Sequence, residues 1–122
     1  GAFRYTTALA PSLCASALAA LDLIQNNPTW GRKLQEESIA LREKLSQNGW
    51  ERPLGNGPII SIILGSDDLA IDYQKELEAE GLLTVAIRPP TVPEGKSRLR
   101  LVIRRNTPVQ AFERLLKVLK NK

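Results

Sequence analysis

Three prolines within residues 89–93 constrain the fold of this chain more than any other feature. Proline fixes φ and has no backbone N–H, so neither a helix nor an inner strand can pass through this stretch. The apolar run 82–87 before it therefore predicts one strand, and the alternating run 98–104 after it predicts another. Arg88 stands where the first run ends, and the stiff loop fixes its direction. Because a guanidinium is a planar fork that matches a carboxylate or phosphate, we interpret Arg88 as a candidate anion-binding residue.

The alternative for Arg88 is a surface arginine that pairs with Glu94 across its own loop. Surface ion pairs of this kind are common and contribute little to stability. The residues alone leave these two interpretations equally open. Thr6 and Thr7, in a segment that looks extended, offer two hydroxyls to an anion, which is a weaker signal because such pairs are frequent.

The rest of the chain is predicted to form helices and one further strand. Ile59 to Leu64 is a β-branched apolar run, which is typical of a buried strand. Pro11 and Thr29 open two long N-terminal helices, and apolar spacing marks two more. The predicted helices cover residues 11–25, 30–47, 68–79 and 108–119.

This order of elements predicts an α+β fold, in which long N-terminal helices precede a small, mainly antiparallel sheet of about three strands covered on one face by helices. The strands 59–64 and 82–87 either pair directly or leave a gap that strand 98–104 fills. At 122 residues the chain fits a single domain. We assign residues 1–48 to a helical lead-in and residues 49–122 to the sheet-and-helix core.

Composition excludes several kinds of chemistry. The chain contains no histidine, which removes histidine-based triads, HExxH zinc sites and histidine acid–base catalysis. Its one cysteine, Cys14, excludes an internal disulfide and a cysteine-rich metal site, so we expect no metal. The uncharged, alanine-rich stretch 8–21 around it is too short to span a bilayer. We expect this stretch to be a buried helix, with Cys14 as a packed thiol.

A mild basic charge leaves a second class of function open. The net charge is +4, from 17 basic and 13 acidic residues spread along the chain. In the predicted strand 98–104, Leu99, Leu101 and Ile103 face one side and arginines face the other. Such a face suits a small module that binds nucleic acid or protein. However, the predicted strands lack the aromatic residues on which RNA-binding sheets stack bases, so we favour a solvated or ion-paired face. The arginines concerned are Arg98, Arg100, Arg104 and Arg105.

Two stretches of the chain resemble a known enzyme family. Residues 86–100 read Ala-Ile-Arg-Pro-Pro-Thr-Val-Pro-Glu-Gly-Lys-Ser-Arg-Leu-Arg. They resemble the C-terminal signature of the 8-amino-7-oxononanoate synthases, which are α-oxoamine synthases among the fold-type I pyridoxal-phosphate (PLP) enzymes. Residues 3–11 resemble the segment shortly downstream of that family's PLP lysine, with Ala10-Pro11 in place of the usual Pro-Pro pair. The string 87–93 favours the oxononanoate enzymes over their glycine-using relatives.

The resemblance implies a PLP-dependent acyltransferase of biotin biosynthesis. Its reaction is the decarboxylative condensation of L-alanine with a pimeloyl thioester, and the enzyme is expected to be a cytoplasmic homodimer with no nucleic-acid or membrane partner. The resemblance implies that Arg88 binds the carboxylate of the amino acid held on PLP and that Thr91 lines the same opening. It further implies that Thr6 and Thr7 lie near the cofactor phosphate.

The chain also departs from the family pattern. No lysine lies in a cofactor-lysine context, and the aspartate and histidine that contact the PLP ring belong to a part of the family that precedes these residues. We therefore expect the C-terminal domain of a longer enzyme, with substrate-binding but no catalytic residues. We expect this chain alone to be inactive and not to bind PLP.

Overall fold

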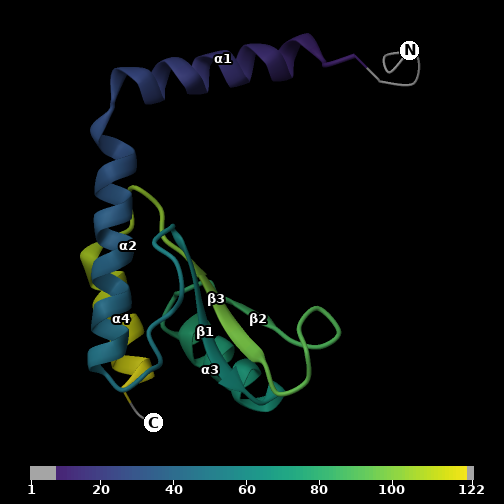
Figure 1. Cartoon of the computed structure of the whole chain (residues 1–122), viewed down its shortest axis with the longest axis vertical. Coiled ribbons are helices and arrows are strands. Elements are labelled where there is room, and N and C mark those ends of the chain that lie inside the picture. The colour runs from purple at the N-terminus through teal and green to yellow at the C-terminus, as the bar shows by residue number, and fades with distance from the viewer. Residues whose placement is uncertain (1–7, 121–122) are drawn as a thin grey trace. The chain divides into compact units, whose positions relative to one another are not determined.

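The computed structural model describes residues 8–120 and contains one antiparallel sheet (Figure 1). Its strands are β1 (Ile59–Gly65), β2 (Val85–Ile87) and β3 (Ser97–Val102), in the spatial order β1–β3–β2. Strand β3 therefore lies between the two strands that flank the third helix, which decides between the two arrangements that the sequence left open. The helices are α1 (Pro11–Asn26), α2 (Thr29–Gln47), α3 (Asp67–Ala79) and α4 (Val109–Leu119). This confirms the predicted α+β fold with a small three-stranded sheet.

Two strands are shorter than the sequence predicts. Residues 82–84 do not join β2, because residues 81 and 82 take part in the cap at the C-terminal end of α3. Leu82 N–H donates to Leu77 O (2.8 Å) and Gly81 N–H donates to Glu78 O (2.9 Å). With Gly81 at φ +75°, this is a Schellman cap. The second shortened strand, β3, ends at Val102, which pairs with the first residue of β1. The residue before β1 is Pro58, which has no N–H to continue the hydrogen-bond ladder.

The core lies on one face of the sheet. The side chains of Ile60, Ile62, Leu99 and Leu101 alternate toward this face and are buried, as the period-two pattern predicts. Helix α3 contacts all three strands, and α2 and α4 complete the cluster with leucines. Each fully buried leucine contributes about 1.5–3 kcal/mol, so this face supplies most of the hydrophobic stabilisation. The core leucines from the helices are Leu41, Leu45, Leu77, Leu115 and Leu119.

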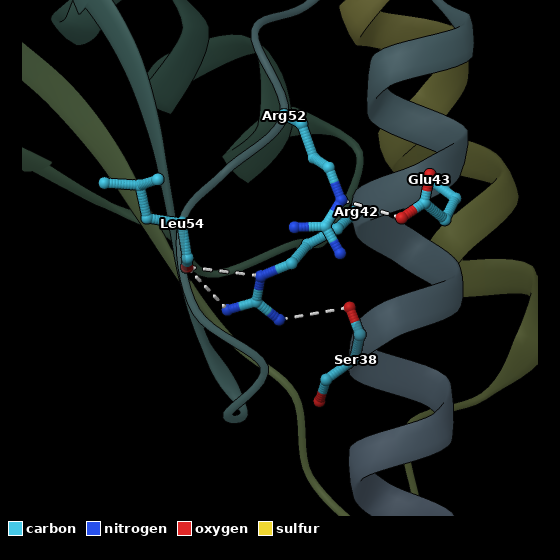
Figure 2. Close-up of polar contacts among 5 residues, drawn as sticks. All are labelled: Ser38, Arg42, Glu43, Arg52 and Leu54. Carbon is cyan, nitrogen blue, oxygen red and sulfur yellow. Dashed lines mark hydrogen bonds and ion pairs between the residues drawn. The ribbon is translucent and has the colours of Figure 1, made fainter.

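Arg42 is a buried arginine that the sequence analysis missed. It lies on α2 and is only 1% exposed (Figure 2). Its guanidinium donates to Ser38 O within the helix, to Leu54 O and Gly57 O in the loop that leads into β1, and to Ile59 O at the start of β1, at 2.9–3.3 Å. Burial, with a smaller contribution from the nearby Arg52 charge, lowers the pKa of Arg42 from its usual value. Arg42 therefore fastens this loop to α2.

Helix α1 differs from the rest of the chain. The chain divides into two compact units between Gly31 and Arg32, and α1 belongs to the first. All of α1 lies within the described residues, and none of its residues is buried. Cys14 is exposed as well. The prediction of a buried helix with a packed thiol is therefore wrong, because apolar composition alone does not supply a surface to pack against. Over residues 8–120, no helix has the length and apolar character needed to cross a membrane.

Candidate functional site

Arg88 follows β2 directly and its side chain is exposed. The chain then turns tightly, since Thr91 N–H donates to Arg88 O (3.1 Å) across the cis peptide bond between Pro89 and Pro90. The hydrogen bond joins the backbones of Arg88 and Thr91, the two residues predicted to bind substrate. Thr91 is exposed on the same turn. The loop therefore presents a guanidinium and a hydroxyl within one turn of backbone.

Helix α3 holds the loop at both ends. Before the loop, Gln74 Oε1 accepts a hydrogen bond from Ala86 N–H (2.7 Å). After it, the buried Ser97 hydroxyl donates to Asp67 Oδ1. Sequence reasoning identified neither Gln74 nor Asp67 as a partner of this loop. The cap itself is Ser66, whose Oγ accepts from Leu69 N–H (3.2 Å). One helix thus fixes both points at which the loop leaves the sheet.

The structure does not support the ion pair between Arg88 and Glu94. Within residues 8–120 the ion pairs join Arg32 to Glu36 and Arg52 to Glu43, and Arg88 takes part in none. An exposed guanidinium on a loop held at both ends remains available for an anion from outside this part of the chain. Of the two interpretations that the sequence left open, the structure favours anion binding.

The face of the sheet away from the helices carries two more arginines. Arg98 lies opposite Ile63 and Ile87, and Arg100 lies between its partners on β1 and β2. Arg98 Nε donates to Lys96 O (3.1 Å), and a groove of about 240 Å³ runs beside it. Arg104 falls beyond the end of β3, so the strand itself carries two of the predicted basic residues.

This open face lacks the features of a nucleic-acid platform. The strand residues that share the face with the two arginines are aliphatic or serine, and none of those that the structure describes is aromatic. Base stacking on a sheet needs aromatic side chains, so the face does not support the RNA-binding alternative. The residues concerned are Ile59, Ser61, Ile63, Val85, Ile87 and Val102.

The described residues offer no feature that identifies a cofactor lysine or its partners. PLP is held through a lysine, with an acidic or basic partner at the pyridine nitrogen. All six lysines within residues 8–120 are exposed, and the chain has no histidine to stack on the ring. Thr6 and Thr7, the residues predicted near the cofactor phosphate, lie outside the described residues. What the structure does show is an exposed arginine and an exposed threonine on one turn, in a loop whose two ends are hydrogen-bonded to α3.

Comparison with known proteins places the chain in a family. Residues 1–119 match the family described as aminotransferase class I and II. The chain is 36% identical over 118 residues to the 8-amino-7-oxononanoate synthase of Lysinibacillus sphaericus, covering 97% of this chain and 30% of that protein. It therefore spans about a third or less of the length of its curated relatives.

Solved structures agree with this assignment. The crystal structure of 8-amino-7-oxononanoate synthase from Francisella tularensis superposes with a TM-score of 0.79 at 26% identity, over 95% of this chain and 34% of that one. The structure of a serine palmitoyltransferase variant from S. paucimobilis with a bound PLP–myriocin aldimine superposes with a TM-score of 0.80 at 22% identity, over 95% of this chain and 30% of that one. At this identity the likeness shows the fold alone. By its sequence and its fold, the chain belongs to the aminotransferase class I and II family.

Proposed function

We propose that this chain is the C-terminal domain of an α-oxoamine synthase and that Arg88 binds the carboxylate of the amino-acid substrate. The observation that carries the proposal is the Arg88 loop, whose guanidinium is exposed and without an ion pair to Glu94, on a turn that α3 holds at both ends. A two-pronged contact to a carboxylate fixes the orientation of the amino acid as well as its position. Orientation matters here because the geometry of the bound amino acid selects the bond that breaks.

The reaction we propose is the condensation of L-alanine with a pimeloyl thioester, which releases carbon dioxide and yields 8-amino-7-oxononanoate. The name and the 36% identity of the Lysinibacillus relative support this choice over glycine-using relatives. PLP, as the cofactor of the complete enzyme, serves as an electron sink for the amino acid. We further propose that the complete enzyme is a cytoplasmic homodimer.

Other residues have supporting roles in this proposal. Thr91, on the same turn as Arg88, lines the opening through which substrate reaches the site. Thr6 and Thr7 contribute hydroxyls near the cofactor phosphate. The cofactor lysine lies outside the described residues, so the 122-residue chain alone is expected to be inactive.

Substitution of Arg88 in the complete enzyme tests the carboxylate contact. We expect Arg88→Ala to raise KM for L-alanine and to lower turnover, for a combined loss of about 100-fold in kcat/KM. Arg88→Lys keeps the positive charge but lacks the planar guanidinium that contacts both carboxylate oxygens, so kcat/KM should fall less, by about tenfold. Arg32→Ala, which removes an exposed guanidinium on α2, is the matched control and should leave both constants unchanged. Unchanged constants in Arg88→Ala would show that the carboxylate binds elsewhere.

Two further measurements test the finer assignments. Assaying the complete enzyme with L-alanine, glycine and L-serine distinguishes the oxononanoate reaction from those of its relatives, and preference for glycine would contradict our choice. Mixing the 122-residue chain with PLP should give no saturable, lysine-dependent absorbance band. Such a band would overturn the expectation that the chain alone does not hold the cofactor.

A further inference from the structure

A cavity lies at the end of β2 opposite to the end that Arg88 follows. It has a volume of about 320 Å³, within the range of small-molecule sites. Residues 81–84 line it just before β2 begins, whereas Arg88 follows the last residue of that strand. The end of β3 and the first half of α4 supply the remaining walls. Most of the lining is apolar, including Leu82, Leu101 and Phe112.

The cavity wall contains a buried polar group without a partner. Thr84 is 6% exposed, and among the residues that the structure describes its hydroxyl has no hydrogen-bond partner. Leaving a buried hydroxyl unpaired costs about 1–3 kcal/mol. Rotation about χ1 to another staggered rotamer moves this hydroxyl without loss of a hydrogen bond, because it makes none among the described residues. Thr84 can therefore direct its hydroxyl toward a polar ligand in the cavity.

The charge around this cavity is positive. Its one charged lining residue is Arg114, and no acidic side chain of the described residues lines it. Arg114 Nη1 donates to Glu80 O (2.9 Å), which holds the guanidinium near the cavity while its other N–H groups point to no partner in residues 8–120. A ligand that pairs with this group is an anion.

The start of α4 adds to this positive potential. The N-cap position of α4 is Pro108, and no side chain caps this end of the helix. The Thr107 hydroxyl instead accepts from Arg104 N–H (2.9 Å) and donates to Arg104 O (2.8 Å). With no acidic residue in its first turn, the N-terminal end of the helix dipole is uncompensated by a side chain. Both Thr107 and Pro108 line the cavity.

We propose that this cavity binds a small monocarboxylate with an apolar chain. The carboxylate pairs with Arg114 and accepts a hydrogen bond from Thr84, in the positive potential at the start of α4. The chain packs against Leu82, Leu101 and Phe112. This site is separate from the Arg88 loop, since neither Arg88 nor Thr91 lines it.

Titration of the full chain with sodium octanoate, followed by ¹H–¹⁵N NMR, tests the proposal. Octan-1-ol is the matched neutral probe. We expect saturable shifts at the amides of Thr84, Ala111 and Phe112 with octanoate, and binding at least about tenfold weaker with octan-1-ol, because the charge-assisted hydrogen bonds are lost. Absence of saturable shifts at these amides, or equal affinity for the two probes, would overturn the proposal.

Single substitutions test each polar contact. Arg114→Gln should weaken octanoate binding about tenfold and leave octan-1-ol binding unchanged. Thr84→Val keeps the volume of the side chain, removes the hydroxyl and should weaken octanoate binding several-fold. Arg32→Gln, outside the cavity lining, should change neither. If Arg114→Gln, which alters only an exposed side chain, binds octanoate as the unsubstituted chain does, then the carboxylate does not lie where we place it.

Discussion

Two arginines in this chain, Arg42 and Arg88, carry the same side chain in opposite surroundings. Arg42 is buried and its guanidinium donates to four backbone carbonyl groups. Figure 2 shows its contacts to Ser38 and Leu54, and the other two acceptors are Gly57 in the loop before β1 and Ile59 at the start of β1. Arg88 is exposed and makes no ion pair within residues 8–120, while hydrogen bonds from α3 hold its loop. One arginine uses its N–H groups to build the fold, and the other is the residue that we propose binds the substrate carboxylate.

The difference follows from what each loop offers. The loop before β1 and the first residue of that strand turn three carbonyl oxygens toward Arg42, whose N–H groups satisfy them. In the loop after β2, residues near Arg88 make the hydrogen bonds instead. Ala86 and Thr91 donate through their backbone N–H groups, and Ser97 donates through its hydroxyl. The guanidinium of Arg88 is therefore not needed for folding. Each loop can be tested by removing what holds it.

The largest expected effect is on the Arg42 loop. Arg42→Ala leaves the carbonyl groups of Leu54, Gly57 and Ile59 without their donors, and we expect the free energy of unfolding to fall by about 3 kcal/mol or more. Urea denaturation of the 122-residue chain measures this change. The exposed neighbour Arg52, which pairs with Glu43 at 2.7 Å, is the matched control.

The controls for this prediction sharpen the comparison. Arg52→Ala should cost less than about 1 kcal/mol, because an exposed pair contributes little. Arg88→Ala should change the free energy of unfolding by no more than about 0.5 kcal/mol. A loss in Arg88→Ala as large as that in Arg42→Ala would show that Arg88 is also structural, and the comparison would fail.

A smaller effect is expected where α3 holds the end of the Arg88 loop. Ser97→Ala removes the hydroxyl that donates to Asp67, and we expect a loss of about 1 kcal/mol in the free energy of unfolding. In the complete enzyme the same substitution should raise KM for the amino acid, though less than Arg88→Ala does, since the loop becomes less well fixed. Ser61→Ala, on the open face of β1, is the matched control and should change neither quantity appreciably. An unchanged KM in Ser97→Ala would mean that the α3 contact does not position Arg88.

Sequence reasoning found the elements of this fold because their signals are local. Pro11 and Thr29 marked the starts of α1 and α2, and the alternation of Leu99 and Leu101 identified the buried face of β3. The prolines after Arg88 likewise identified the loop that the structure presents. These features depend on residues close together in the chain, where backbone sterics decide the outcome.

What the sequence did not reveal depends on distant partners. Arg42 looked like any polar helix residue, and its role appears only when residues 12 to 17 positions later fold back onto it. Gln74 reaches Ala86 and Asp67 reaches Ser97 in the same way. The buried setting expected for Cys14 failed for a related reason, because alanine-rich composition says nothing about which surface, if any, covers a helix.

The smallest expected effect is a pH dependence of the free energy of unfolding that arises from the buried core residue Tyr73. Tyr73 packs edge-on against Trp50, with ring centroids 5.8 Å apart, and burial, with a smaller contribution from Glu76, raises the pKa of Tyr73 above its usual value of 10.0. Because the unfolded chain then loses the phenolic proton first, the contribution of Tyr73 to stability is fully present below pH 10 and declines as pH rises through the folded-state pKa. Urea denaturation should therefore show a steeper loss of stability above pH 10 in the unsubstituted chain than in Tyr73→Phe, which has no proton to lose. Equal slopes would mean that Tyr73 ionises as freely in the folded chain as in the unfolded one.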